Sequence, residues 1–257
     1  MGAASSSLLV AADANPVTVD NPGGLSPILL LGDHAGCEIP ARLGDLGLSS
    51  ADMQRHIACD IGVAGLGAEL SRRLDATFIH QRFSRLVIDC NRAPGAEGSI
   101  AVQSDGSHVA GNAGINDTER QQRVKEVFQP YHDRVAAELD ARFALGRRTI
   151  LVSLHSFTPA LANAPRPWRF GVLHRHDSSF SYTVLADLRS AWGEEVGDNQ
   201  PYAMDEVDHT IPFHADRRGL DYLELEVRQD LIANLPDQIC VARSLVGVLA
   251  RAAANRP

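Results

Sequence analysis

This sequence of 257 residues lacks membrane-spanning runs, phosphate-binding loops and an excess of basic charge. No apolar run approaches the roughly 20 residues that cross a bilayer. No predicted strand leads into GxGxxG or a Walker phosphate loop, since the glycines of GVAGLG (62–67) lie inside a helical pattern. The net charge of −8 offers no basic face to a nucleic acid. These absences argue against a membrane protein, a nucleotide-binding protein and a nucleic-acid-binding protein.

Cysteine is scarce, and its spacing is uninformative. The four cysteines, Cys37, Cys59, Cys90 and Cys240, are far apart and include no CxxC pair. We therefore expect free thiols in a reducing cytoplasm. The first residues have no basic segment and only a short apolar stretch, unlike a secretory signal peptide. This agrees with a cytoplasmic location.

What the sequence does contain is an alternation of short apolar runs with longer amphipathic segments. This alternation predicts an α/β protein with a mixed, mostly parallel twisted sheet and helices on both faces. We expect residues 1–24 to be a loosely ordered lead-in and residues 25–257 to form a single three-layer domain. Strands are predicted at 27–33, 76–81, 85–90, 149–155, 169–174 and 220–228, and helices at 50–74, 117–146 (disturbed at Pro130), 179–193 and 237–254.

Polar side chains stand at or near the ends of four predicted strands. In open α/β sheets the carboxyl ends of parallel strands meet at one edge, where binding sites form. The loop at 92–116 is too long to serve only as a connection, and we expect it to help shape such a site. The strand-end residues are Asp33 and His34, then Asp89, Asn91 and Arg92, then His155 and Ser156, and finally Glu224, Glu226 and Arg228.

Two of these residues are histidines in corresponding positions, His34 and His155. A single buried histidine is usually a hydrogen-bonded core residue, but two at neighbouring strand ends favour a metal site, since imidazole is the commonest metal ligand. A catalytic zinc takes three protein ligands and keeps one position open. The third ligand is a carboxylate, either Asp60 or Glu38. We prefer Asp60, because its apolar surroundings predict burial and a buried acid needs a partner.

The strand at 220–228 alternates, with Glu224, Glu226 and Arg228 on one face. An exposed polar face is the ordinary interpretation, but in a sheet covered on both sides such a face usually lines a cleft. Arginines near the third predicted strand, Arg85 and Arg92, suit carboxylate recognition because the planar guanidinium matches a carboxylate with two hydrogen bonds.

Taken together, these segments resemble the zinc carboxypeptidase and aspartoacylase superfamily, and within it most closely the N-formylglutamate amidohydrolase family. The resemblance lies in four motifs, whose order and spacing extend over residues 27–232. They are His34-Ala35-Gly36 before Pro40, Ile88-Asp89-Cys90-Asn91-Arg92, Ser153-Leu154-His155-Ser156-Phe157 and Leu225-Glu226-Val227-Arg228. The sequence departs from the carboxypeptidase pattern His-x-x-Glu, because position 37 is a cysteine and Glu38 comes one residue late.

The resemblance implies a carboxypeptidase-like fold and a cytoplasmic, zinc-dependent amidohydrolase of amino-acid catabolism. Its substrate would be a small N-acyl amino acid, most readily N-formyl-L-glutamate, cleaved to formate and L-glutamate. Zn²⁺ would be held by His34, Asp60 and His155, with Glu38 in reserve and Cys37 a weaker candidate ligand. Glu226 would be the general base, with Glu224 as the alternative.

Further roles follow from the same resemblance. Arg85 would stabilise the oxyanion, Asn91 and Arg92 would hold the α-carboxylate, and His214 and Arg217 would meet a second carboxylate. The loop at 197–209 would be a lid, with Tyr202 reaching inward. The alternatives are a carboxypeptidase-like peptidase, a deacylase for another acyl amino acid, or a non-catalytic relative that binds a dicarboxylate. No nucleic-acid or membrane partner is expected, and the oligomeric state is open.

Overall fold

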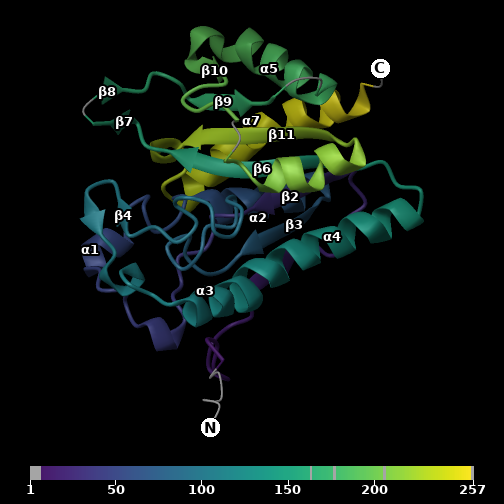
Figure 1. The fold of residues 1–257 in the computed structure, drawn as a ribbon. Helices are drawn as coiled ribbons and strands as arrows, with labels where there is room; N and C mark the ends of the chain where they lie inside the picture. The colour runs from purple at the N-terminus through teal and green to yellow at the C-terminus, as the bar shows by residue number, and fades with distance from the viewer. Residues whose placement is uncertain (1–6, 163, 176–177, 205–206, 256–257) are drawn as a thin grey trace.

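A computed structural model of the chain describes residues 7–162, 164–175, 178–204 and 207–255. In this part of the chain a seven-stranded sheet has the strand order β1-β3-β2-β6-β11-β9-β10 (Figure 1). The central pairs β3–β2, β2–β6 and β6–β11 are parallel, whereas β1–β3 and β11–β9 are antiparallel. The strands are β1 (Val17–Asp20), β2 (Ile28–Gly32), β3 (Thr77–Gln81), β6 (Ile150–Phe157), β9 (Phe170–Leu173), β10 (Val196–Asp198) and β11 (Asp221–Arg228). The prediction of a mixed, mostly parallel α/β sheet is confirmed.

Helices cover both faces of the sheet and give it two apolar cores. One core joins the sheet to α2, α5 and α7, and the other joins it to α4, α6 and the buried loop after β3 (Figure 1). Consecutive residues of β2 divide between the cores, with Leu30 in the first and Leu29 and Leu31 in the second. The longer helices are α2 (Val63–Leu74), α4 (Gln129–Ala144), α5 (Ser179–Trp192) and α7 (Leu235–Ala254), and the shorter ones are α1 (Ser50–Met53), α3 (Asp117–Arg123) and α6 (Thr210–His214). None of the helices described is long and apolar enough to cross a membrane.

The helix predicted at 50–74 is interrupted, and the interruption matters for the site. It ends as α1 at Met53 and restarts as α2 at Val63. Gly62 precedes α2 with a φ of 85°, and a Cβ there would lie 2.1 Å from the carbonyl oxygen of Ile232. Only glycine fits that backbone conformation and that contact. The break leaves Asp60 in a turn, where its side chain is free to face the carboxyl edge of the sheet.

The strand predicted at 85–90 was wrong. Residues 85–87 form a turn, and the segment bonds to neighbouring loops, with the N–H of Asp89 donating to the carbonyl of Ser99 at 2.8 Å. Leu86, Val87 and Ile88 are nevertheless buried in the second core. A short apolar run indicates burial, and here the buried backbone is a turn and not a strand.

Two further differences concern the N-terminal segment and the helix predicted at 117–146. Residues 17–20, expected in a loose lead-in, form the edge strand β1. The helix predicted at 117–146 contains a π-helical stretch at 124–128, just before Pro130. Proline has no N–H to donate to the carbonyl four residues earlier, so the helical hydrogen bonding shifts there. Residues 1–6 of the predicted lead-in lie outside the described part of the chain.

The prediction of four free thiols was also wrong. Cys37 and Cys59 form a disulfide, with Cα atoms 5.2 Å apart, whereas Cys90 and Cys240 are free. The 22-residue separation gave no sequence signal, because the two cysteines meet only when the loops after β2 and before α2 come together. Cys37 is therefore not available as a thiolate ligand.

Candidate active site

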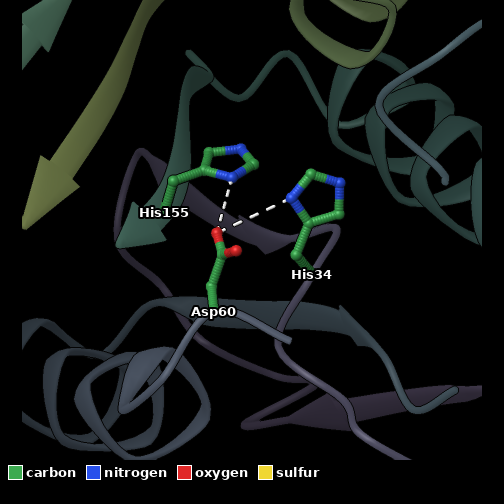
Figure 2. A group of neighbouring side chains, drawn as sticks. All are labelled: His34, Asp60 and His155. Carbon is green, nitrogen blue, oxygen red and sulfur yellow. Dashed lines mark hydrogen bonds and ion pairs between the residues drawn. The ribbon is translucent and has the colours of Figure 1, made fainter. Parts of the chain in front are cut away.

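Three buried side chains from separate segments converge at the carboxyl edge of the sheet. His34 follows β2, Asp60 precedes α2, and His155 lies near the end of β6. One ligand atom from each, two imidazole nitrogens and a carboxylate oxygen, lies within 4.8 Å of the others (Figure 2). The structure thus brings together the three residues that the sequence predicted as metal ligands, and Glu38 is not part of this group. Glu38 is exposed and paired with Arg82 at 2.8 Å.

The backbone around these ligands is tied together locally. The N–H of Asp60 donates to the carbonyl of His34 at 2.9 Å, and the N–H of Ser156 donates to Asp60 Oδ2 at 3.2 Å. The Cys37–Cys59 disulfide links the same two loops covalently. Side chains far apart in the sequence are therefore held in place by main-chain contacts as well as by their own.

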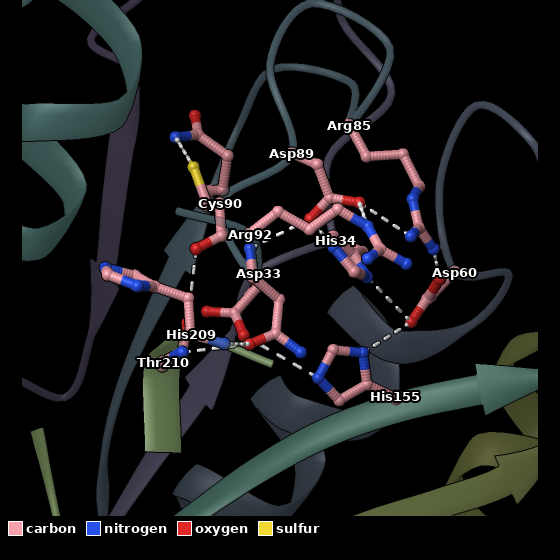
Figure 3. A network of polar contacts seen from close by, with 12 residues as sticks. Asp33, His34, Asp60, Arg85, Asp89, Cys90, Arg92, His155, His209 and Thr210 are labelled. Carbon is pink, nitrogen blue, oxygen red and sulfur yellow. Dashed lines mark hydrogen bonds and ion pairs between the residues drawn. The ribbon is translucent and has the colours of Figure 1, made fainter. Parts of the chain in front are cut away.

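The two imidazoles present the same nitrogen to Asp60. His34 Nδ1 lies 3.6 Å from Asp60 Oδ2, is buried and has no hydrogen-bond partner, and His155 Nδ1 lies 3.0 Å from the same oxygen. On the other side of each ring, Nε2 faces a different carboxylate: His34 Nε2 lies 2.7 Å from Asp89, and His155 Nε2 lies 3.6 Å from Asp33 (Figure 3). A carboxylate behind an imidazole fixes the ring and the tautomer that leaves the facing nitrogen free to bind a metal.

The charges around the three residues also fit a cation. Burial alone would raise the pKa of Asp60, but the imidazoles of His34 and His155 outweigh it and hold that pKa below its usual range. Burial would lower the pKa of His155, yet Asp33 and Asp60 together raise it well above its usual value. Two imidazole nitrogens and a carboxylate oxygen are a donor set suited to a divalent transition metal. The group therefore fits a metal ion by its chemistry.

A buried glutamate stands beside this group on the next strand. Glu226 of β11 is in register with His155 of β6, and one of its carboxylate oxygens is buried with no hydrogen-bond partner. Burial raises the pKa of Glu226 to about 7, with His155 opposing the shift. Glu224, two residues earlier on the same face, is also buried, and burial raises its pKa to about 8. A carboxyl group with a pKa near neutrality suits proton transfer, and Glu226 lies closer in register to His155.

A cavity of about 300 Å³ opens over these residues. Its wall includes the three candidate ligands, both glutamates, and the predicted residues Arg85, Asn91 and Arg92. The remaining lining residues are His56, Asp89, Ser156, Phe157, Thr158, Leu173, Tyr202, Ala203, Val207 and Asp208.

The polar side chains from the loop after β3 are engaged to different degrees. Arg85 donates to Asp89 at 2.7 Å and lies 3.5 Å from Asp60. Arg92 reaches only within 3.8 Å of Asp89, and its side chain is 32% exposed. The Oδ1 atom of Asn91 accepts the N–H groups of His209 and Thr210, so this oxygen holds the loop in place and does not face a ligand. Arg92 is thus the freest of the three.

Two predicted substrate-binding residues are not brought to the cavity. His214 is the last residue of α6 and is buried, with its Nε2 atom 3.0 Å from Nδ1 of His132. Arg217 stacks over the ring of Phe213, with 4.5 Å between its Cζ atom and the ring centroid. Neither residue lines the cavity. Of the predicted lid, Tyr202 lines the cavity, and residues 205–206 lie outside the described chain.

Other residues acquire a place in the site that the sequence did not assign. Asp33 and Asp89 stand behind the two imidazoles, and Tyr131 donates to Asp33 at 2.5 Å. The strand-end pattern had included Asp33 and Asp89, but without giving either acid a role. Arg166 lies behind Tyr202, and nothing in its sequence context pointed to the site.

Comparison with known proteins gives a consistent result. Residues 26–233 match the sequence profile of the family described as N-formylglutamate amidohydrolase. The crystal structure of a gene product from Agrobacterium tumefaciens is similar at 35% identity, with a TM-score of 0.92, over 96% of this chain and 98% of that one. The crystal structure of an N-formylglutamate amidohydrolase from Ralstonia eutropha shares the fold at 20% identity, with a TM-score of 0.66, over 94% of this chain and 98% of that one. No curated protein matches the chain.

Proposed function

This chain belongs to the N-formylglutamate amidohydrolase family, and on that premise we propose that it is a zinc-dependent hydrolase of small N-acyl amino acids. N-formyl-L-glutamate is the first candidate substrate, giving formate and L-glutamate. The observation that carries the proposal is the gathering of His34, Asp60 and His155 around one point, with Glu226 on the adjoining strand. A structural cluster has no need of an open cavity or of an unpartnered buried base.

His34, Asp60 and His155 would hold the metal, His34 and His155 through Nδ1 and Asp60 through a carboxylate oxygen. When bound, zinc supplies Lewis acidity, which lowers the pKa of water toward about 7 and polarises an acyl oxygen. Asp89 and Asp33 orient the two rings for this purpose. Because each imidazole is hydrogen-bonded or ion-paired on its far side, neither can rotate away without losing that contact.

Glu226 would take a proton from the attacking water and pass it to the leaving amine. It is a general base in the first step and a general acid in the second. A pKa of about 7 keeps both protonation states within reach near neutrality. The guanidinium of Arg85, fixed between Asp60 and Asp89, would donate to the oxyanion as negative charge develops, a contribution on the order of 3 kcal/mol.

The substrate's α-carboxylate would bind Arg92, the least engaged arginine of the lining. The amide of Asn91 contributes by holding the loop at 208–210, since its Oδ1 atom is occupied by two backbone N–H groups. The cavity volume of about 300 Å³ favours a small substrate over a peptide. A carboxypeptidase-like peptidase and a deacylase for a different acyl group remain the nearest alternatives.

A cytoplasmic location and a place in amino-acid catabolism are part of the proposal. The Cys37–Cys59 bond stands against the location, because disulfides persist mainly in oxidising compartments. A small-molecule substrate follows from family membership, and the absence of nucleic-acid and membrane partners remains a prediction from composition.

The direct test is formate release from N-formyl-L-glutamate by the purified protein, with zinc content measured in parallel. Glu226→Gln should keep the zinc content of the wild type and lose nearly all turnover. Glu224→Gln is the matched variant two residues away, and it should lose much less. If Glu226→Gln stays active and Glu224→Gln does not, Glu224 is the base. If the wild type takes up zinc stoichiometrically but hydrolyses no formyl, acetyl or peptidyl derivative, the chain is a binding protein and not an enzyme.

A further inference from the structure

Arg166 is a buried cation beside the candidate active site. It follows the hairpin of β7 (Ala160–Leu161) and β8 (Ala164–Pro165), which projects beyond the sheet near the carboxyl ends of β6 and β11 (Figure 1). Its backbone N–H donates to the carbonyl of Pro159 at 2.9 Å, which turns the chain back toward the sheet. Only 8% of Arg166 is exposed.

The guanidinium of Arg166 touches the wall of the cavity. Its Nη1 atom donates to Thr158 Oγ1 at 3.1 Å and to the hydroxyl of Tyr202 at 3.0 Å. Its Cζ atom lies 4.8 Å from the centroid of the Tyr202 ring. Thr158 and Tyr202 both line the cavity that contains Glu226. Arg166 therefore lies directly behind that wall, with Thr158 and Tyr202 between it and the open space.

The charge of Arg166 has no counterpart among the described residues. No ion pair joins its guanidinium to a carboxylate of this part of the chain, and the hydrogen bonds described for it both leave from Nη1, to Thr158 and to Tyr202. Arg85, by contrast, meets two carboxylates. A buried cation is costly unless an anion and hydrogen bonds compensate it, and among the described residues only the hydrogen bonds are present.

Tyr202 adds a second donor at the same place. Its hydroxyl oxygen accepts from Arg166, so its own hydrogen is free to point elsewhere. Burial raises the pKa of Tyr202, which keeps the phenol protonated at neutral pH. An anion at this wall would meet the phenolic O–H directly, with the charge of the guanidinium immediately behind it.

We propose that Arg166 and Tyr202 form the subsite for a second carboxylate, the side-chain carboxylate of an acidic N-acyl amino acid. This inference rests on the proposed function and names the specificity of the same site. A substrate with two carboxylates needs two cations, and with Arg85 already paired, Arg92 in the cavity wall and Arg166 directly behind that wall provide them. His214 and Arg217, which the sequence suggested for this role, contact His132 and Phe213 and no residue of the cavity wall that the structure describes.

The test compares N-formyl-L-glutamate with N-formyl-L-norvaline, which has a side chain of similar reach without the carboxylate. Arg166→Met keeps much of the packing volume and removes the charge. Its kcat/KM for N-formyl-L-glutamate should fall by about tenfold to a hundredfold, chiefly through KM, because a hydrogen-bonded charge is lost. Its kcat/KM for N-formyl-L-norvaline should change by less than about threefold. Tyr202→Phe should show the same pattern, but smaller.

Arg169→Met is the matched control, since Arg169 is close in the chain but is paired with Glu195 away from the cavity. It should leave both substrates unchanged. An equal loss on both substrates in Arg166→Met would mean that Arg166 only supports the fold, and no loss on either would remove it from recognition. Either result overturns the proposal.

Binding of glutarate and of butyrate, measured by calorimetry, separates this proposal from the hydrolase proposal. The zinc-loaded wild type should bind glutarate more tightly than butyrate, and Arg166→Met should lose that preference while keeping its melting temperature within a few degrees. If no N-formyl amino acid is hydrolysed but the preference exists and depends on Arg166, the hydrolase proposal fails and the subsite stands. If Arg166→Met does not fold, Arg166→Lys and Tyr202→Phe carry the same comparison. Unchanged glutarate preference in both would contradict the subsite.

Discussion

The two ends of the candidate site differ in the sign of the charge that their side chains carry. At the metal end, His34, Asp60 and His155 are buried, and acids stand behind both rings (Figure 3). The other end, which we call the rim, consists of Arg166, Thr158 and Tyr202. There Arg166 is a cation without a described carboxylate partner, and Tyr202 beside it is 43% exposed. One end has an excess of negative groups and fits a cation, whereas the other has a positive group with no carboxylate partner in the described part of the chain and fits an anion. We propose that each end binds a ligand of the opposite charge.

The difference also extends to how the two ends are held. The metal end is fixed by backbone hydrogen bonds, by β2 and β6 at the middle of the sheet, and by a disulfide. The rim consists of a two-stranded hairpin and a loop, joined through a guanidinium and a phenol. Metal ligands need positions fixed to a fraction of an ångström, while substrate recognition tolerates a wall that adjusts. The comparison therefore assigns affinity for the metal to one end and specificity for the substrate to the other.

The largest expected effect comes from removing the carboxylate that both imidazoles face. Asp60→Asn should abolish stoichiometric zinc binding and lower kcat/KM by roughly a thousandfold or more, since the metal contributes several kcal/mol to the transition state. Metal analysis after dialysis and formate release measure the two effects. Glu38→Gln is the matched control for the reserve ligand and should match the wild type in both. Loss of zinc in Glu38→Gln with retention in Asp60→Asn would reverse the assignment of the ligands.

A smaller effect is expected from the disulfide that joins the ligand loops. Cys37→Ser should lower the free energy of unfolding by on the order of 3 kcal/mol, from the lost restraint on the unfolded chain. It should also weaken zinc binding, since the loops carrying His34 and Asp60 lose their covalent link. Denaturant unfolding and a zinc competition titration measure these changes. Cys240→Ser, at an exposed free cysteine, should change neither. Equal zinc affinity in Cys37→Ser and wild type would mean that the hydrogen bonds alone hold the loops.

The smallest effect concerns Glu224 and the pH dependence of the free energy of unfolding of the metal-free protein. Burial raises the pKa of Glu224 to about 8 from an ordinary 4.5, so the folded state binds this proton more tightly than the unfolded state. Its contribution to stability is complete below pH 4.5 and is lost as the pH rises through about 8. Glu224→Gln should therefore be more stable than the wild type at pH 8.5, by on the order of 2 kcal/mol, and this gain should shrink toward pH 5. Unfolding curves at both pH values check this, and a gain that is independent of pH would refute the assignment.

The comparison also explains how far the sequence could lead. The metal end lies on strands whose apolar runs and polar ends are local patterns, so His34, His155 and Glu226 could be located without coordinates. Asp60 was chosen because a buried acid needs a partner, and the structure supplies two imidazoles. The fold class followed from the same alternation of strands and helices. These are properties of short segments, which the sequence displays directly.

The rim could not be found in this way. Arg166 is brought to the site by a hairpin turning back on Pro159 and by contact with Tyr202, and both are tertiary events with no sequence period. His214 and Arg217 looked plausible because a histidine and an arginine preceded the base strand. In the structure His214, at the end of α6, contacts His132, and Arg217, in the turn that follows, stacks over Phe213. The Cys37–Cys59 disulfide was not predicted from the sequence for the same reason. In each of these examples, contacts between residues far apart in the sequence determine where the side chain lies.

The central claim is that a single divalent ion lies between His34, Asp60 and His155. Anomalous scattering at the zinc edge from crystals of the zinc-loaded protein tests it most directly. The account predicts one peak at about 2.0–2.2 Å from Nδ1 of both histidines and from a carboxylate oxygen of Asp60, with Glu226 facing the open side. A peak elsewhere, or zinc-loaded protein with no peak among these three residues, would contradict the account.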